Sequence, residues 1–225
     1  MLIESVPNFS EGRRAEVCEA IAAAARGRGV KILGLEMDRD HNRSVLTFVG
    51  EPDAVAEAAF AAAAKALELI DLNVHQGQHP RMGALDVLPF VPLQGAAMAD
   101  AVALARRVGR RLGAELGLPV YLYEAAAPRP ERRNLAALRT PQFEGLKEMI
   151  GKDPDRVPDF GPSRIHPTGG CAAVGARMAL IAYNVDLETG DIAVAKAIAK
   201  KIRERDGGLP GLKALGLYLA DRKCA

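Results

Sequence analysis

The loop from His75 to Gly83, with the sequence HQGQHPRMG, carries the side chains whose types best suit chemistry. Pro80 disfavours the helical conformation for His79 and holds that residue extended. An imidazole fixed in this way, with an ordinary pKa of about 6.5, suits proton transfer at neutral pH. Arg81 beside it is a cation able to bind a carboxylate. The loop therefore predicts an acid–base site, and a plain surface loop with incidental histidines fits the spacing equally well.

A metal site is an alternative use of the same loop, because His75 and His79 are four residues apart. On a helix that spacing would place both rings on one face. Gly77 and Pro80 argue against a helix, and no nearby carboxylate is offered as a third ligand. Asp86 belongs to a predicted strand, where alternate residues point to opposite faces. We therefore expect no metal and keep a metal-dependent hydrolase as an alternative hypothesis.

Two further segments carry candidate site residues. In the charged turn at 38–43, DRDHNR, Asp38 ends a strand and could orient a histidine, as acidic partners do in acid–base sites. Residues 39–41 are typical of a solvated hairpin tip. In the segment 159–170, DFGPSRIHPTGG, glycines expose backbone N–H groups among polar side chains, and ligands favour clefts between domains. Pro and Gly also mark plain linkers, so that alternative stays open.

Hydrophobic periodicity predicts the elements that must position these segments. Apolar runs predict strands at residues 2–6, 30–37, 43–49 and 84–91. Amphipathic patterns predict helices over residues 10–27 and 50–72. The order β-α-β-β-α-β predicts an α/β fold of the α+β plait type, a ferredoxin-like split βαβ with a mixed sheet. Right-handed crossovers place its helices on one face.

The pattern continues with a helix at 98–117, a fifth strand at 119–123 added at the sheet edge, and a short helix at 142–150. Residues 151–170 are predicted to be a long loop that joins this unit to the next. A second, partial α/β unit then follows, with strands at 178–185 and 212–219 on either side of a helix at 191–205. Such a unit leaves a sheet face or edge uncovered, so we expect a partner chain or a longer natural functional unit.

Composition narrows the class of protein. The 225 residues are 49% hydrophobic and 26% charged, which suits one large domain or one domain with part of a second. A net charge of +2 predicts no general attraction to nucleic acid or membrane surfaces. Three cysteines without a CxxC pair argue against a disulfide framework and a structural zinc site. The first residues lack a secretory signal pattern, and the alanine-rich run at 54–69 is interrupted by charges. We therefore expect a cytoplasmic protein.

Six ordered motifs resemble those of the glutamate formimidoyltransferase (formiminotransferase) family, from about residue 3 to the end of the chain. They are VPNFSEG at 6–12, NR with TFVG within 42–50, HPRMGALDV at 79–87, PVYLY at 119–123, DFGPS at 159–163 and GAR at 175–177. Six motifs in order are far more specific than any one of them.

The resemblance implies transfer of a formimino group from N-formimino-L-glutamate to tetrahydrofolate, which gives L-glutamate and 5-formimino-tetrahydrofolate. The family's catalytic histidine falls on His79, its acidic residue after the second strand on Asp38, and its folate-contacting loop on Gly161–Gly170. In that loop the residues that match the family pattern are Gly161, Pro162, Ser163, Pro167 and Gly170. The loop members whose identities do not carry over are Arg164, Ile165, His166, Thr168 and Gly169.

These roles predict tetrahydrofolate as cosubstrate, no metal, and Arg81 as a substrate-binding residue. In the predicted mechanism His79 is the general base toward the attacking folate amine and then protonates the departing glutamate nitrogen. Two alternatives stay open. One is a glutamate formyltransferase that uses 5-formyl-tetrahydrofolate, and the other is a non-catalytic folate-binding module.

The resemblance also implies two α/β subdomains around a folate cleft, and a homodimer. Residues 1–177 correspond to the N-terminal subdomain, and residues 178–225 to the start of a C-terminal subdomain that is incomplete here. Family members have a longer second subdomain, so we expect either a fragment or a natural short form. The matched motifs do not include the cyclodeaminase domain that is fused to some relatives.

Overall fold

The structure is a computed structural model that describes residues 1–181, 183 and 185–218, and it divides into two compact units, Met1–Ala179 and Leu180–Ala225. The first unit is built on a mixed sheet with the strand order β1-β4-β2-β5-β7-β6, and β3 pairs with β4. The strands are β1 (Ile3–Ser5), β2 (Asn8–Phe9), β3 (Lys31–Asp38), β4 (Arg43–Gly50), β5 (Leu85–Pro92), β6 (Val120–Glu124) and β7 (Ala172–Ala176).

The directions of the strands decide which strand ends lie at the same end of the sheet. β1 is antiparallel to both β4 and β5, so β4 and β5 run the same way. β7 is parallel to β5 and to β6. The N-terminal ends of four strands therefore lie at one end of the sheet, together with the C-terminal end of β3, which is antiparallel to β4.

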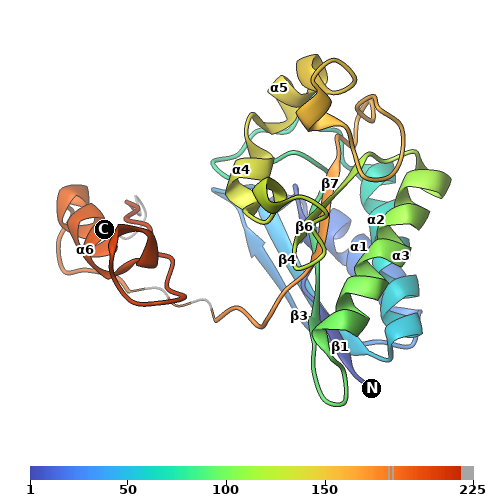
Figure 1. Ribbon diagram of the computed structural model, residues 1–225, viewed down its shortest axis with the longest axis horizontal. Helices are drawn as coiled ribbons and strands as arrows, with labels where there is room; N and C mark the ends of the chain where they lie inside the picture. The colour runs from blue at the N-terminus through green and yellow to red at the C-terminus, as the bar shows by residue number, and fades with distance from the viewer. Residues whose placement is uncertain (182, 184, 219–225) are drawn as a thin grey trace. The chain divides into compact units, whose positions relative to one another are not determined.

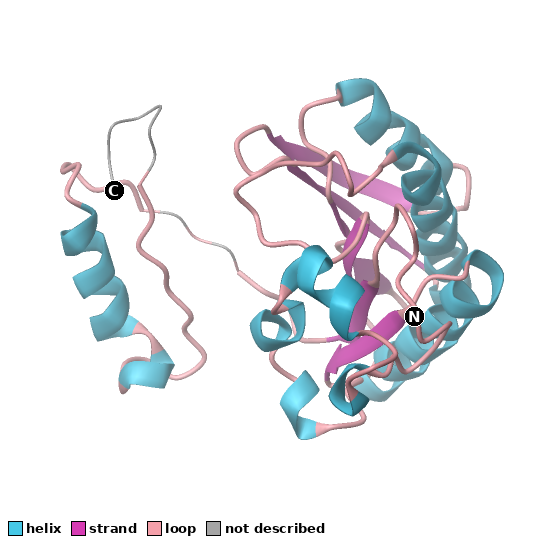
Figure 2. Cartoon of the chain, turned by 90° about the horizontal axis from the view of Figure 1, so that it is seen from above, coloured by secondary structure: helices cyan, strands magenta, loops and turns pink. Residues whose placement is uncertain are grey.

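Three long helices lie side by side on one face of this sheet, α1 (Ala15–Arg26), α2 (Pro52–Leu69) and α3 (Met98–Leu116) (Figures 1 and 2). The buried side of α2 is almost entirely alanine. Small side chains let this helix approach both of its neighbours and the sheet closely. α3 ends at Gly117, whose positive φ of 62° suits the left-handed conformation of a helix cap.

The other face of the sheet is covered over its parallel half by two short helices, α4 (Leu135–Arg139) and α5 (Gln142–Met149). Alternate residues of β6 point to opposite faces. Leu122 belongs to the core under the long helices, whereas Tyr121 and Tyr123 pack with Leu138 and Leu146 on the other side. The short helical turns η1 (Pro130–Arg132) and η2 (Pro154–Arg156) lie in the same part of the chain.

The predicted plait and its long helices on one face are confirmed, and β6 lies at the sheet edge as expected. One central strand was not predicted. β7 lies between β5 and β6, so the segment 159–170 leads into the first unit's own sheet, and the prediction that it joins the two units is wrong. β7 is covered on both faces, and Gly175 packs directly against Tyr123. A strand buried on both faces needs small apolar residues rather than alternation, so its sequence, AAVGA, has no period of two.

The second unit contains α6 (Ile192–Ile202) and the short turn η3 (Glu204–Asp206). The predicted helix is confirmed with tighter bounds, and Asp191 caps it by accepting a hydrogen bond from the Ala193 N–H.

The predicted strands at 178–185 and 212–219 are wrong for the described residues, which form no strand there. Residues 182, 184 and 219 lie outside the described residues. The pattern alone cannot make a strand, because a strand requires a hydrogen-bonded neighbour. The assignment of residues 178–225 to a C-terminal subdomain stays a prediction.

Candidate active site

The predicted site segments meet at the end of the sheet where β4, β5 and β7 begin. Asn42 is buried in the turn between β3 and β4, and its side-chain amide donates to the Gln76 carbonyl at 2.9 Å while its amide oxygen accepts from the Gly12 N–H at 3.0 Å. Gly83 and Gly170, which precede β5 and β7, form an antiparallel bridge. The turn at 38–43, the loop at 75–83 and the loop at 161–170 are thus joined by hydrogen bonds.

His79 is half-buried and faces a second histidine. Its ring centroid lies 6.3 Å from that of His41, edge to face at 64°. His41 Nδ1 is 2.8 Å from Asp38 Oδ2, and Asp38 Oδ1 accepts hydrogen bonds from the backbone N–H groups of Asp40 and His41. Asp38 therefore does orient a histidine, but in this structure that histidine is His41, which lies between Asp38 and His79.

The surroundings of His79 keep its imidazole neutral. Burial, followed by the positive charges of Arg139 and Arg43, lowers the pKa of His79 to about 3. A positive charge nearby disfavours a second one, and burial removes the water that would stabilise it. A neutral imidazole has a lone pair available for a proton, so the ring is in the protonation state that a general base requires.

Arg139 connects the loop to α4 and β5. Its guanidinium makes a buried ion pair with Asp86 at 2.7 Å, and the other Asp86 carboxylate oxygen accepts the Met82 N–H at 2.8 Å. Burial raises the pKa of Asp86. Because Met82 follows His79 by three residues, this pair holds the end of the histidine loop against the sheet and places a cation beside His79.

Arg81 is buried and fully occupied by protein groups. Its two terminal nitrogens contact the Glu144 carboxylate at 3.0 and 2.7 Å, and its Nε donates to His75 Nδ1 at 3.0 Å. The other ring nitrogen of His75 lies 2.9 Å from the Asn42 carbonyl, so protein partners engage both ring nitrogens. The substrate-binding role of Arg81 stays a prediction, and its contacts are those of a clamp between the loop and α5. A metal ion at His75 would have to displace one of these partners.

The loop 161–170 is held mainly through its backbone. His166 and Gly170 exchange two backbone hydrogen bonds of 3.1 Å, and the Thr168 and Gly169 carbonyls accept from residues 72 and 84 at 2.9 Å. Gly170 has φ 69°, and a Cβ there would lie 2.2 Å from the Met82 carbonyl oxygen. The loop therefore follows a path that glycine permits. Its predicted contact with folate is untested.

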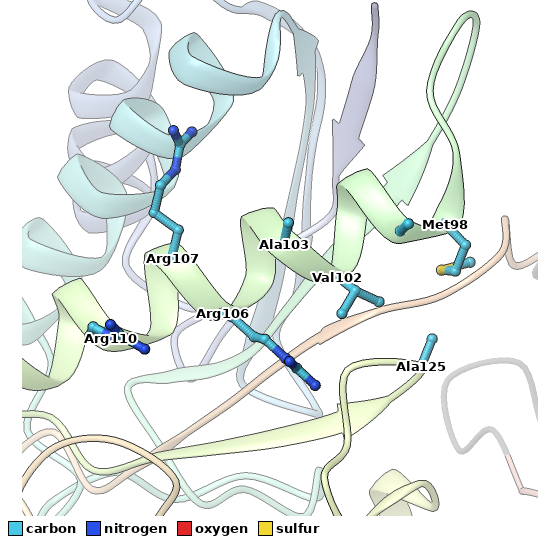
Figure 3. Close-up of a pocket in the computed structure, with 8 residues that line it drawn as sticks. Met98, Val102, Ala103, Arg106, Arg107, Arg110 and Ala125 are labelled. Atoms are coloured by element: carbon cyan, nitrogen blue, oxygen red, sulfur yellow. The ribbon is translucent and has the colours of Figure 1, made fainter.

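Two hollows on the first unit can be compared with the position of the histidine loop. The smaller, about 240 Å³, is lined by Pro80, Arg139 and α4–α5 residues, and so adjoins the histidine loop. The larger, about 660 Å³, lies along α3 (Figure 3). There Arg106 extends along the hollow toward the side of Ala125, whereas Arg107 points away and pairs with Asp53. None of the residues lining the larger hollow belongs to the histidine cluster, so its size does not make it the reaction site.

Within the described residues, no helix is long and apolar enough to cross a membrane, and no group of three His, Cys, Asp or Glu side chains is placed to hold a metal ion.

Comparison with known proteins decides the family. The sequence profile of the formiminotransferase domain, N-terminal subdomain, matches residues 2–177. The chain belongs to the formiminotransferase family.

Relatives of this formiminotransferase chain extend the match past residue 177. A glutamate formimidoyltransferase from Thermoplasma acidophilum is 51% identical over 98% of this chain and 73% of its own length. One from Streptococcus pyogenes serotype M1 is 47% identical over the whole chain and 75% of its own length. A formimidoyltransferase-cyclodeaminase from Rattus norvegicus is 43% identical over the whole chain, which spans 42% of that relative.

The structure adds three residues to the formiminotransferase site that the sequence did not single out. They are His41, Arg43 and Arg139. His41 was assigned to a solvated hairpin tip, although an Asp three residues before a His in a turn is a signal that could have found it. Arg43 stood in a matched motif without a role. Arg139 comes from a short helix 60 residues after His79, and only the tertiary structure brings the two together.

Proposed function

We propose that this chain transfers the formimino group of N-formimino-L-glutamate to tetrahydrofolate, giving L-glutamate and 5-formimino-tetrahydrofolate. The observation that supports it most directly is the neutral, half-buried His79 among cations in a chain of this family. The names of the two relatives that match 100% and 98% of the chain agree with the same transfer.

In the proposed mechanism, N5 of tetrahydrofolate attacks the formimino carbon while His79 accepts the N5 proton. The resulting tetrahedral centre then collapses, the bond from carbon to the glutamate nitrogen breaks, and His79 returns the proton to that nitrogen. One C–N bond forms and one breaks, and the proton passes from one amine to the other. Positioned acid–base catalysis of this kind contributes about 10²- to 10⁴-fold.

Asp38 has a supporting role in this proposal. Its carboxylate holds His41, whose ring is arranged edge to face with that of His79, so Asp38 is a positioning residue that acts through His41. The loop Gly161–Gly170 is proposed to contact the folate with its exposed residues. We further propose that the protein is a cytoplasmic homodimer that binds neither nucleic acid nor membranes. Light scattering of the purified chain measures its mass and so tests whether it is a dimer.

A transfer assay with two donors tests the function. The purified chain is offered tetrahydrofolate with N-formimino-L-glutamate and, separately, L-glutamate with 5-formyl-tetrahydrofolate, and products are followed by chromatography. We expect 5-formimino-tetrahydrofolate and L-glutamate from the first pair. Turnover of the second pair alone would identify a formyltransferase instead. Calorimetric binding of folate with no turnover of either pair would identify a non-catalytic binding module.

A further inference from the structure

Three arginines surround the histidine loop, and two of them already hold carboxylates. Arg81 is paired with Glu144, and Arg139 with Asp86. Arg43, at the start of β4, instead donates from two of its nitrogens to the side-chain oxygen of Asn8. Among the residues that the structure describes, no carboxylate oxygen lies within ion-pair distance of the Arg43 guanidinium.

The contact with Asn8 orients Arg43 without neutralising it. The Asn8 amide group donates to the Val6 carbonyl at 2.9 Å, which directs its oxygen toward the guanidinium. Asn8 carries no charge, and a half-buried cation held only by a neutral amide lacks the opposite charge that buried ions normally have. Burial, together with the neighbouring positive charge of Arg139, lowers the pKa of Arg43. The carboxylates of Asp86, Asp38 and Glu36 oppose this shift from farther away, and none of them is in ion-pair contact with the Arg43 guanidinium.

We propose that Arg43 binds a carboxylate of the amino-acid donor beside His79. This inference rests on the proposed function and names the group that recognises the donor. Arg43 is the arginine of the three whose charge is not already matched by a protein carboxylate, and a guanidinium binds carboxylates through paired hydrogen bonds. Arg43 lies 38 residues before Arg81, for which the sequence predicted a substrate-binding role.

The chemistry of the two substrates indicates which carboxylate is bound. In N-formimino-L-glutamate the α-carboxylate sits on the carbon that carries the reacting nitrogen. The carboxylates of tetrahydrofolate lie beyond its aminobenzoyl group, far from N5. His79 must reach N5 and the departing nitrogen, so a carboxylate bound by a cation close to His79 belongs to the donor.

Binding of this carboxylate has a consequence for the base. The positive charge of Arg43 is one of the causes that lower the pKa of His79. A bound carboxylate opposes that charge, so the pKa of His79 rises when the donor is present and the ring becomes a stronger proton acceptor in the complex.

Steady-state kinetics of Arg43→Gln and Arg43→Lys test the proposal. A lost charge pair of this type costs about 30-fold or more in affinity. We expect KM for N-formimino-L-glutamate to rise by about that factor in Arg43→Gln and by less in Arg43→Lys, with KM for tetrahydrofolate unchanged. The matched control is Arg106→Gln on α3, which removes an arginine outside the site and leaves both KM values unchanged.

A donor whose α-carboxylate is replaced by a carboxamide separates direct contact from a structural role. The wild-type chain should bind this analogue about as weakly as Arg43→Gln binds the natural donor, and Arg43→Gln should show little further loss. Equal losses from Arg43→Gln with both donors would overturn the proposal, as would a rise in the tetrahydrofolate KM alone, which would assign Arg43 to the folate tail. Calorimetry measures the affinity for each donor directly and needs no turnover. A chain that binds the donors as expected but does not turn them over would contradict the proposed function and not this inference.

Discussion

The loops at 75–83 and 161–170 lead into neighbouring parallel strands and touch through the Gly83–Gly170 bridge, yet they are held in different ways. The first is fixed by charged and polar side chains, above all Arg81 on Glu144. The second is fixed largely by its own backbone and by glycines that allow its path, and residues such as Ser163 remain exposed.

Substitutions at the first loop should therefore act mainly through electric charge, and substitutions at the second mainly through the path of the backbone. Around the loop 75–83, a substitution of Arg139 or Arg43 changes the electric field at His79, because the charges of these two arginines lower the pKa of its ring. In the loop 161–170, most side chains are not needed to hold the path, whereas an added Cβ at Gly170 collides with the backbone before β5. We therefore expect chemistry to fail first in one loop and folding in the other.

The largest effect is expected for His79→Asn. Loss of the proton acceptor should reduce the turnover number by about 10²- to 10⁴-fold. The melting temperature should stay close to that of the wild type, because no hydrogen bond of the His79 ring is found within the described residues. Steady-state kinetics and thermal unfolding measure the two quantities. Near-normal turnover in this variant would refute the assignment of His79 as the base.

The next effect concerns shape and is expected for Gly170→Ala. Its φ of 69° and a Cβ 2.2 Å from the Met82 oxygen combine backbone strain with a clash, and should lower the free energy of unfolding by about 2–4 kcal/mol. Gly117→Ala is the control, since its φ is 62° but nothing lies within 4 Å of the added Cβ. It should cost only about 1 kcal/mol. Equal losses in denaturant titrations would show that the contact between the loops does not matter.

A smaller effect on turnover is expected for Asp38→Asn. The amide cannot hold His41 as the carboxylate does, so the orientation of that ring beside His79 is weakened. We expect turnover to fall roughly tenfold with KM values little changed, which is about 1.4 kcal/mol. Asp40→Asn is the matched control. Asp40 lies in the same turn, and its backbone N–H and carbonyl make hydrogen bonds to Asp38 and Gln78 that the substitution keeps. The assignment fails if both variants behave alike.

The last prediction concerns acid sensitivity, which changes neither turnover nor the stability at neutral pH. The pKa of His79 is about 3 in the folded chain, below an unfolded value of about 6.5, so the unfolded state binds the proton more readily. The stability contributed by neutral His79 is fully present above pH 6.5 and is lost as the pH falls from 6.5 toward 3. His79→Asn should lose less stability over this window in denaturant titrations. A parallel decline in both proteins would show that His79 is not held neutral.

The sequence by itself was enough for the plait, its long helices and the family. Helix and strand periodicities are local, and the amphipathic helices and alternating strands each carry their own signal. The position of His79 was also predictable, because Pro80 restricts its backbone directly. The strand β7 was not, since an Ala- and Gly-rich segment shows no pattern until parallel neighbours bury both of its faces.

Only the tertiary structure decided the electrostatics of the site. Arg81 looked free for a substrate next to His79, but Glu144, 63 residues later, occupies it. The charge of Arg139, on a separate helix, acts on His79, and among the described residues no carboxylate forms an ion pair with Arg43. Charge balance in a half-buried site depends on distances of a few ångströms between segments far apart in sequence, because Coulomb interactions fall off with separation and are screened by water. The sequence predicts His79 as the acid–base residue, and the fold determines its protonation state.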